Sequence, residues 1–341
     1  LINAEKKNGF YSKLISETTN GPSDHLVKFS ITPNPILLVL RCIKLLILLK
    51  KTKPDLIFVH NSTSALLPLL ISRFSCVSKI IYFNHGLPFL GYVGLLRFLL
   101  ISLEKLNCFF SDLIITVSYD LKKKYMNLTK KNVNIIHNGS ASGLDLKSKI
   151  QNINLINKIK KKLSFNTNDI IILYVGRPNR RKGFFDIIKI WDDDFKNKKN
   201  FKLMLLGINQ NDFFKKIGNI PENIFPMGLV TETEPYFCLA DYLFMTSHHE
   251  GLSYTILEAF KHRTVVISNN VYGVTELVKN GFNGFLVDKN NKNDYVKFLN
   301  YCEINQKLKK KMLDRSIELI SKYSRQSFLK HYIKFIEKLK L

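Results

Sequence analysis

Two glutamates stand eight positions apart in the stretch SHHEGLSYTILEAF, residues 247–260. Glu250 directly precedes a glycine, and Glu258 falls inside a predicted helix over 254–261 that Ser253 would cap. The free amide groups and the positive dipole end of such a helix attract an anion, so a diphosphate would fit there. Glu250 would then lie beside whatever the diphosphate carries, and Glu258 could accept hydrogen bonds from a vicinal diol such as a ribose. The pattern favours a nucleotide sugar, although spacing alone leaves open a capping residue and a solvated helix face.

A basic loop lies about seventy residues earlier, in ILYVGRPNRRKGFFDII. Arg177 and Lys182 follow the end of a predicted strand and precede a predicted helix. Two cations in that position would reach a diphosphate from the opposite wall of a site. The alternative is a solvated basic turn, because Arg180 and Arg181 are neighbours. Whether those two arginines take part stays open.

Two further candidates follow strands in the first half of the chain. His85 comes directly after the strand IIYFN and before Gly86, so it would project beyond the end of that strand. A lone histidine in that place is more often structural. The pair Asn138-Gly139 follows VNIIH in the same way. The glycine is expected for backbone geometry, with Asn138 or Ser140 as a weaker candidate for ligand contact.

Metal and dinucleotide sites are not indicated. His248 and His249 stand beside Glu250, but adjacent residues point to opposite sides of an extended segment and no third ligand has a suitable spacing. The chain has no G-x-G-x-x-G after a strand and no G-x-x-x-x-G-K-[ST]. Dinucleotide oxidoreductases and P-loop enzymes therefore lack their phosphate loops here.

The motifs together resemble the retaining GT-B glycosyltransferases of the family 4 group, whose signature is a glutamate, seven residues and a second glutamate. The resemblance runs over most of the chain. It includes the glycine-arginine and lysine-glycine pairs at 176–177 and 182–183, Gly228 in FPMGLV, Ala240-Asp241, and GVTELVKNGFNGFLVDKNN over 273–291. The segments NHGLPFLGYVGLLRFLL and IIHNGSASGLD are similar to the subset that builds bacterial surface polysaccharides such as O-antigen, lipopolysaccharide and capsule.

The resemblance implies a metal-independent transferase with a nucleotide diphosphate sugar, UDP-sugar being the expected donor. Negative charge on the departing nucleotide would be stabilised by Arg177, Lys182 and the helix start, with the leaving phosphate taking the acceptor proton. A different glycosyltransferase fold holds a divalent ion with an Asp-x-Asp pair, but the run 192–194 here predicts a solvated helix end. The implied catalytic residues are Glu250, His85, Arg177 and Lys182, and the implied donor-binding residues are Glu258, Gly251, Leu252, Ser253, Tyr254, Thr255, Gly86 and Asn138.

Short apolar runs alternate with longer amphipathic ones, a pattern typical of βαβ units around a parallel sheet. We expect two Rossmann-like, doubly wound domains that face a cleft, the GT-B arrangement. The expected layout is an acceptor-side domain over 1–150, a linker over 151–168, a nucleotide-sugar domain over 169–323 and a helix over 324–341 that crosses back onto the first domain. The predicted strands are 55–60, 79–84, 113–117, 133–136, 170–175, 201–207, 242–246 and 264–268.

Composition agrees with this assignment. The 341 residues suggest about two domains, and 45% hydrophobic residues supply real cores. Against 27 Asp and Glu, 52 Lys and Arg give a formal net charge of +25, which favours anionic partners. Five cysteines, odd in number and scattered, look like reduced thiols of a cytoplasmic protein.

Membrane contact is expected at the surface only. No run of roughly 18 apolar residues is present, and the first residues lack the apolar core of a signal peptide. The resemblance implies that a first strand precedes Leu1. Segments 36–51 and 91–110 combine large apolar residues with a few basic ones, as helices lying in a bilayer surface do, although helices that cover a sheet look much the same.

The sequence therefore predicts a cytoplasmic enzyme, peripheral on the inner face of the membrane. It would retain anomeric configuration as it moves a hexose or N-acetylhexosamine from a UDP-sugar to a lipid-linked surface polysaccharide intermediate. The alternatives are a non-catalytic basic binder of acidic membrane or nucleic acid, and a phosphorylase or epimerase on the same fold. A nucleic-acid binder needs a basic stripe with interleaved aromatic residues, whereas the lysines here are spread over the chain, so nucleic acid is not an expected partner.

Overall fold

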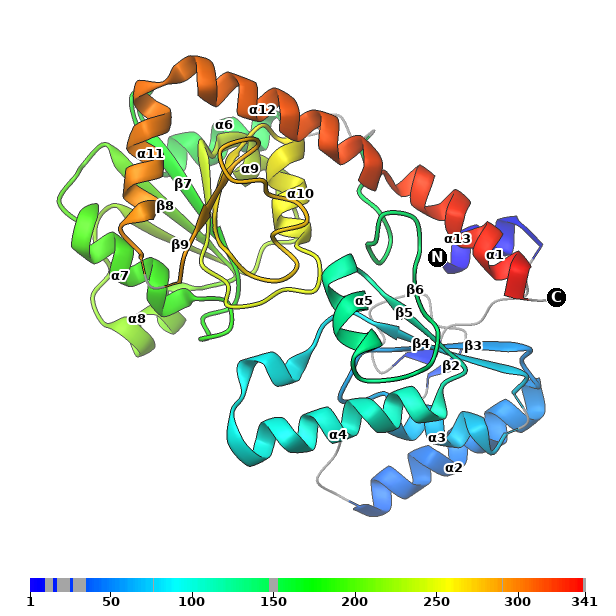
Figure 1. Ribbon diagram of the computed structural model, residues 1–341. Helices are drawn as coiled ribbons and strands as arrows, with labels where there is room; N and C mark the ends of the chain where they lie inside the picture. The colour runs from blue at the N-terminus through cyan, green and yellow to red at the C-terminus, as the bar shows by residue number, and fades with distance from the viewer. Residues whose placement is uncertain are drawn as a thin grey trace. The chain divides into compact units, whose positions relative to one another are not determined.

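The chain folds into two compact units. The computed structural model describes residues 1–9, 15–16, 25–26, 35–75, 77–146, 153–289 and 291–339. The first unit comprises Leu1–Gly143 together with Arg325–Leu341, and the second comprises Leu144–Ser324. The segment 151–168, expected as a linker, contains helix α6 (Ile153–Lys162) and is grouped with the second unit. Figure 1 shows the elements of both units.

The second unit is built on a six-stranded parallel sheet in the order β12-β11-β10-β7-β8-β9. From β7 the chain continues to β8 and β9 on one side of the sheet. It then returns to β10, on the other side of β7, and continues to β11 and β12. The direction in which strands are added therefore reverses between β7 and β10. In open α/β sheets, ligands bind outside the carboxyl ends of the strands at such a switch point. The strands are β7 (Ile170–Val175), β8 (Phe201–Leu206), β9 (Ile224–Gly228), β10 (Tyr242–Met245), β11 (Val265–Asn269) and β12 (Phe285–Val287).

Helices cover both faces of this sheet, with α7, α8 and α11 on one face and α6, α9 and α10 on the other (Figure 1). The central strands β7 and β10 consist of apolar and aromatic residues, as is typical of strands that are buried on both faces. Trp191 of α7 is fully buried in the core of the first of these faces, where its indole N–H donates to Asn223 Oδ1 at 3.0 Å. The helices are α7 (Phe184–Asp194), α8 (Gln210–Ile217), α9 (Glu234–Leu239), α10 (Tyr254–Lys261), α11 (Asp294–Ile304) and α12 (Gln306–Ile320), followed by the 3-10 turn η2 (Ser321–Tyr323).

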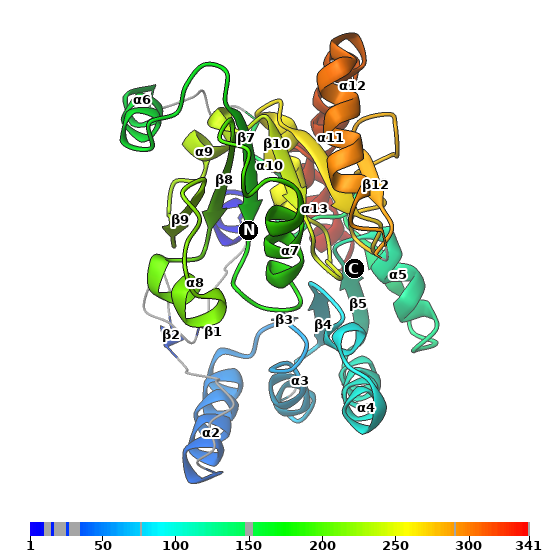
Figure 2. The same cartoon turned by 90° about the vertical axis from the view of Figure 1, so that its left-hand side faces the viewer.

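The first unit has a four-stranded parallel sheet in the order β3-β4-β5-β6. Helices α2, α3 and α4 lie beside one another along one face, in both views (Figures 1 and 2). Two-residue strands β1 (Ile15–Ser16) and β2 (His25–Leu26) pair in parallel. The remaining elements are α1 (Ile2–Lys7), α2 (Pro35–Thr52), β3 (Leu56–His60), α3 (Leu66–Arg73), β4 (Lys79–Asn84), η1 (Pro88–Gly91), α4 (Gly94–Phe110), β5 (Leu113–Thr116), α5 (Tyr119–Met126), β6 (Val133–Ile135) and α13 (Arg325–Leu339).

The last helix, α13, packs within the first unit although it is the end of the chain. Tyr332 is buried, donates a hydrogen bond to the Glu5 carboxylate of α1, and packs its ring 5.8 Å from that of Phe58 in β3. Both contacts join Tyr332 to residues that lie more than 270 positions earlier in the sequence.

The predicted α/β class with parallel sheets is confirmed, and all eight predicted strands are present within one residue at either end. The sequence analysis does not predict the two-residue strands β1 and β2 or the strands β9 and β12. β9 contains Pro226, which removes a ladder donor and is tolerated because β9 is an edge strand. β12 is only three residues long and forms the other edge. Among the described residues, none of the helices combines the length and apolar character needed to cross a bilayer.

Candidate active site

Two loops meet at the switch point of the second unit's sheet. One follows β7 and covers residues 176–183, and the other follows β10 and covers residues 246–253. Because β7 and β10 are parallel neighbours, their carboxyl ends lie at the same edge. The two sequence motifs that suggested a diphosphate site are therefore adjacent in space.

Lys182 and Glu250 form a close ion pair across these loops. Lys182 Nζ lies 2.6 Å from Glu250 Oε1, and the two side chains are only 20% and 10% exposed. Arg181 adds a second cation, with its guanidinium 3.9 Å from Glu250 Oε2. The structure thus brings together two of the predicted catalytic residues, together with Arg181.

The loop after β7 is held against the end of β10. Tyr174 donates its hydroxyl to the carbonyl of Lys182 at 3.0 Å, and Asn179 Oδ1 accepts the Lys182 amide at 2.9 Å. Gly183 has a φ of +68°, and a Cβ at this position would lie 2.0 Å from the carbonyl oxygen of Thr246. Only glycine satisfies both the left-handed backbone and the close approach. The glycine that follows Lys182 in this loop therefore has a steric cause.

The loop after β10 is supported by residues 272–273. The Glu250 amide donates to the Tyr272 carbonyl at 3.2 Å, and the Ser253 amide donates to the Gly273 carbonyl at 3.4 Å. Gly273 has a φ of +76°, and a Cβ there would lie 2.6 Å from the carbonyl oxygens of both Glu250 and Gly251. Sequence reasoning did not assign this support, although Gly273 begins the glycine-rich stretch that it had quoted.

Helix α10 begins at the predicted position, Tyr254. Ser253 caps it by accepting the Ile256 amide at 3.4 Å. Of the predicted donor-binding residues here, Leu252 and Ser253 are buried, whereas Gly251, Tyr254 and Thr255 are partly exposed. The first amides of a helix have no acceptor within it, so this end is suited to an anion.

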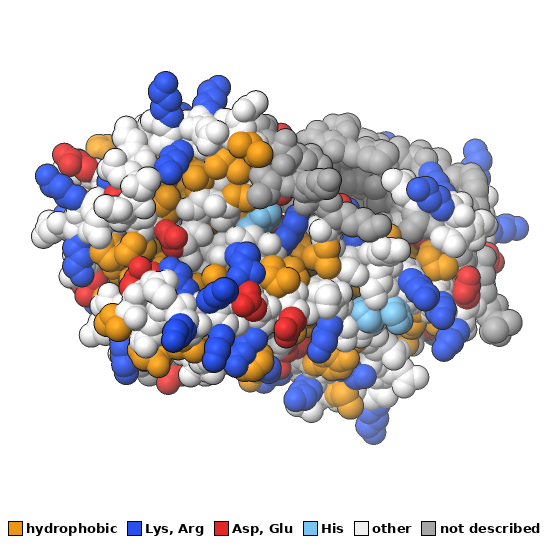
Figure 3. Space-filling view, turned by 90° about the horizontal axis from the view of Figure 1, so that it is seen from above, with side chains coloured by type: hydrophobic (Ala, Val, Ile, Leu, Met, Phe, Trp, Pro, Cys, Tyr) orange, Lys and Arg blue, Asp and Glu red, His pale blue; other side chains and the backbone are white. Residues whose placement is uncertain are grey.

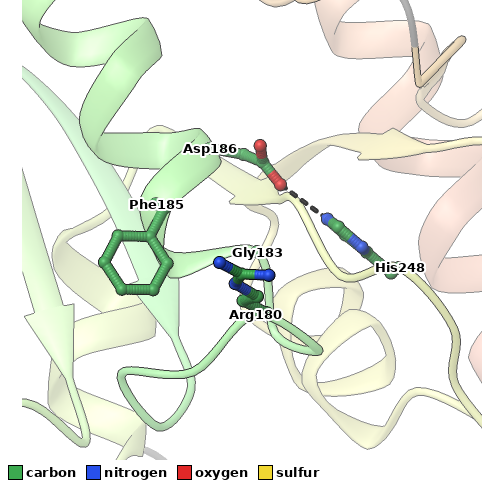
Figure 4. A pocket seen from close by; sticks show the side chains of 5 residues that line it. All are labelled: Arg180, Gly183, Phe185, Asp186 and His248. Carbon is green, nitrogen blue, oxygen red and sulfur yellow. Dashed lines mark hydrogen bonds and ion pairs between the residues drawn. The ribbon is translucent and has the colours of Figure 1, made fainter. Parts of the chain in front are cut away.

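A cavity of about 300 Å³ opens beside the basic loop, lined by Arg180, Gly183, Phe185, Asp186 and His248 (Figure 4). Asp186 Oδ2 lies 2.6 Å from His248 Nε2, and Asp186 Oδ1 bonds Lys292. Burial alone would raise the pKa of Asp186, but its hydrogen bonds with Lys292 and His248 lower it overall. The carboxylate thus joins the start of α7 to the segment that carries Glu250, a link that sequence reasoning missed.

The two adjacent histidines have different environments. The His248 side chain is 45% exposed and faces Asp186, whereas His249 is buried. Burial, followed by the nearby Arg181 charge, lowers the pKa of His249 to about 4. Across the residues that the structure describes, no three His, Cys, Asp or Glu side chains are grouped so as to hold a metal ion.

The other predicted cations extend into solvent. Arg177 and Arg180 are exposed, and neither side chain makes a hydrogen bond or ion pair with the described part of the chain. Arg180 lines the cavity. Asp192 and Asp193 are exposed at the end of α7.

Glu258 lies on α10 beside a histidine one turn later. Its Oε2 is 3.7 Å from His262 Nε2, and Cys238 Sγ is 3.4 Å from His262 Nδ1. Burial alone would lower the pKa of His262, whose side chain is 5% exposed, but interactions with Cys238 and Glu258 raise it to about 9. The charged imidazolium is thus favoured beside Glu258. The i, i+4 spacing on a helix was the signal that could have predicted this pair.

The remaining predicted site residues belong to the first unit. His85 Nε2 lies 2.9 Å from His60 Nδ1, and the Gly86 amide donates to Asn84 Oδ1 at 2.8 Å. Asn138 Nδ2 lies 3.0 Å from His137 Nε2. Ser140 is buried, and its hydroxyl accepts the Gly143 amide at 2.9 Å, so this serine stabilises its own turn.

Comparison with known proteins identifies the chain. Residues 156–318 match the family of glycosyl transferases group 1, and residues 6–140 match glycosyltransferase family 4. The Staphylococcus aureus capsular polysaccharide biosynthesis glycosyltransferase CapM is 29% identical over 261 residues, covering 72% of this chain and 67% of CapM. The Escherichia coli UDP-Gal:alpha-D-GlcNAc-diphosphoundecaprenol alpha-1,3-galactosyltransferase is 25% identical over 268 residues, covering 74% and 67%.

A solved structure shares the fold. Anabaena HepE, in a complex with UDP-glucose, has a TM-score of 0.72 and 16% identity, covering 87% of this chain and 82% of HepE. With both parts of the chain matched by glycosyltransferase families and with its two parallel-sheet units, the protein belongs to the family 4 glycosyltransferases of GT-B fold.

Proposed function

We propose that the protein transfers a hexose or N-acetylhexosamine, with retention of anomeric configuration, from a UDP-sugar to a lipid-linked surface polysaccharide intermediate. The observation that carries the proposal is the Lys182–Glu250 pair beside the start of α10, at the switch point of the second sheet. The HepE complex with UDP-glucose supports the donor class. The diphosphoundecaprenol in the name of the E. coli relative supports the lipid-linked acceptor.

The donor diphosphate would lie between Lys182 and the first amides of α10. An ammonium group has three donors, so Lys182 can bond Glu250 and a phosphate oxygen together. Negative charge develops on the phosphate as the sugar departs, and donors that are already in place stabilise it without reorganisation. Arg177, which has no protein partner among the described residues, would add a second cation. Glu250 would orient the sugar hydroxyls and hold Lys182.

Acceptor activation in this scheme uses the leaving phosphate, which would take the acceptor proton. His85 and Asn138 would contact the sugar from the first unit, with Gly86 allowing close approach of the backbone. The scheme needs no metal ion. Glu258 would hold the ribose of the nucleotide, with the His262 side chain one turn later on the same helix.

The membrane face of the enzyme would be formed by α2 and α4 of the first unit. Both carry large apolar side chains that are strongly exposed, among them Ile36 at 72%, Leu95 at 73% and Phe98 at 65%. Exposed basic residues accompany them, namely Lys44, Lys50, Lys51, Arg97 and Lys105. α2 has no acidic residue, and the single one in α4, Glu104, is buried. An apolar surface with only positive charge suits an anionic bilayer at the inner face of the membrane.

On the face seen in Figure 3, lysine and arginine are scattered among other residues and form no stripe. A nucleic-acid groove would require such a stripe with aromatic residues between the charges. We therefore propose a membrane surface, and not nucleic acid, as the anionic partner.

The first prediction separates the roles of the ion pair. Glu250→Ala is expected to abolish UDP release in the presence of acceptor while UDP itself binds as well or better, because Lys182 loses its competing carboxylate. Lys182→Ala is expected to weaken UDP binding and to lower kcat/KM by about 100-fold, since it removes a donor to the developing charge. Calorimetry with UDP, and UDP release from a panel of UDP-sugars with and without a membrane extract as acceptor, measure these effects.

The exposed Glu222→Ala serves as the matched control and should behave as wild type. Wild-type turnover in Glu250→Ala would contradict the assignment.

Transfer should survive EDTA, because the scheme uses no metal ion. If chelation stops transfer and manganese restores it, the metal-free scheme is wrong and the 192–194 run must be reconsidered. UDP release that is independent of any acceptor would favour the alternative chemistries on this fold.

The second prediction concerns the ribose. Glu258→Ala should weaken UDP binding by about 1–3 kcal/mol, because ribose hydroxyls lose a charged acceptor in a partly buried position. Uridine alone should show the same loss, and inorganic diphosphate should show none. Equal affinity of mutant and parent for UDP would refute the role.

The third prediction is a pH dependence that His262 imposes on stability. Its pKa is raised to about 9 in the folded chain. The stabilisation is therefore complete below the unfolded pKa of about 6.5 and disappears as pH rises through about 9. The difference in unfolding free energy between wild type and His262→Gln should fall between pH 6.5 and pH 9.5. Thermal or urea unfolding at several pH values measures it, and a difference that is constant with pH would contradict the charged imidazolium.

The fourth prediction tests the membrane face. The protein should co-sediment with phosphatidylglycerol vesicles at low salt, not with phosphatidylcholine vesicles, and high salt should release it. Leu95→Ser with Phe98→Ser should reduce binding strongly. Leu229→Ser with Ile304→Ser, at positions of the second unit that are even more exposed (94% and 82%), should not. Equal losses in both double variants, or no vesicle binding by wild type, would refute this surface.

A further inference from the structure

A fully buried carboxylate in the first unit has no part in the scheme above. Glu104, on the inner side of α4, is 0% exposed. Burying a carboxylate is costly unless hydrogen bonds compensate, so its partners indicate what it stabilises. Burial raises the pKa of Glu104, while the hydroxyl donors around it act in the opposite direction.

Three hydroxyl groups converge on Glu104. Tyr82 donates to Oε2 at 2.9 Å, Tyr125 donates to the same oxygen at 2.6 Å, and Ser62 donates to Oε1. The next turn of α4 adds Asn107, whose Nδ2 donates to the Ser62 carbonyl at 3.0 Å. The buried side of α4 thus bonds the segment after β3 through both the side chain and the backbone carbonyl of Ser62.

A continuous chain of hydrogen bonds leads from Glu104 to the loop after β4. Tyr82, besides donating to Glu104, accepts from Asn84 Nδ2 at 2.9 Å. Asn84 Oδ1 in turn accepts the Gly86 amide at 2.8 Å. Asn84 and Gly86 are the two sequence neighbours of His85, so the peptide unit that follows His85 is linked to Glu104 of α4 through Asn84 and Tyr82.

The two anchored loops carry histidines that contact each other. His60 ends β3, two residues before Ser62, and its Nδ1 lies 2.9 Å from His85 Nε2. The two rings stack with their centroids 5.2 Å apart and an interplanar angle of 19°. A hydrogen bond between ring nitrogens requires one donor and one acceptor, so at least one ring is neutral and each fixes the tautomer of the other.

We propose that Glu104 is a positioning residue for His85: through Ser62 on one side and Tyr82–Asn84 on the other, it sets the distance between the two histidine loops. The inference rests on the proposed role of His85 as a sugar contact. Loss of the network would shift the imidazole without removing it. A displacement of about 1 Å at a reacting centre costs on the order of 100-fold in rate, which makes such an anchor consequential.

Two tyrosines provide a matched test. Tyr82→Phe and Tyr125→Phe each remove a buried hydroxyl bond to the same Glu104 oxygen, together with the 3.4 Å contact between the two hydroxyls, but only Tyr82 also bonds Asn84. Both variants should lower the thermal stability, and Tyr82→Phe should lower it more, because it also leaves the buried Asn84 Nδ2 without this acceptor. Only Tyr82→Phe should change the imidazole ¹⁵N shifts of His85 and His60, and only it should lower kcat for transfer from the UDP-sugar by about tenfold or more.

The carboxylate itself is tested by two substitutions. Glu104→Gln keeps the size and one acceptor oxygen and should restore part of the activity that Glu104→Leu loses. If Glu104→Leu does not fold, the comparison of Tyr82→Phe with Tyr125→Phe still tests whether the network positions His85. Equal activity losses in Tyr82→Phe and Tyr125→Phe, or unchanged ¹⁵N shifts in Tyr82→Phe, would overturn the inference. If His85→Ala keeps full transfer, the role of His85 in the proposed function fails, while the ¹⁵N shifts continue to report on positioning.

Discussion

The close approach of two loops at the switch point of the second sheet is the constraint on which the candidate site depends. It requires glycine at two positions, 183 and 273, where a Cβ would collide with the carbonyl oxygens of Thr246 or of Glu250 and Gly251. Once the loops are that close, Lys182 and Glu250 are within 2.6 Å of each other and α10 starts beside them. The parallel sheet determines where the site forms, and the glycines determine how tightly it is assembled.

Hydrogen bonds and ion pairs from outside these loops then fix their orientation. Asp186 links the first turn of α7 to His248 and Lys292. In the first unit, Glu104 has an analogous place, because a helix holds the loops that follow two neighbouring strands. In both units a carboxylate on a helix is bonded to residues near the carboxyl ends of the strands, where ligands of such folds bind.

Much of the fold could be predicted from the sequence, since buried parallel strands are continuous apolar runs and Ser253 is a strong capping signal. The resemblance singled out Glu250 and Lys182, and their contact follows from the strand order. What could not be predicted depends on contacts between distant residues with no local pattern. Asp186 and Lys292 are 106 positions apart, and Ser62 and Glu104 are 42 apart. The segment 151–168 reads as a polar connection because α6 is lysine-rich on its outer side, yet it packs on α9. The edge strand β9 escaped prediction because of its proline.

The pairing of Lys182 with Glu250 also bears on which anions the candidate site would admit. A lone, partly buried lysine beside a helix start would attract any small anion, inorganic phosphate included. Here the protein supplies its own counter-ion at 2.6 Å. A small anion must compete with that carboxylate for the ammonium group and has little else to bind. A ligand that also presents hydroxyl groups can donate hydrogen bonds to the Glu250 carboxylate. These bonds compensate for the weakening of the ion pair between Glu250 and Lys182. The pairing of Lys182 with Glu250 would therefore disfavour inorganic phosphate relative to a phosphate ligand that carries hydroxyl groups.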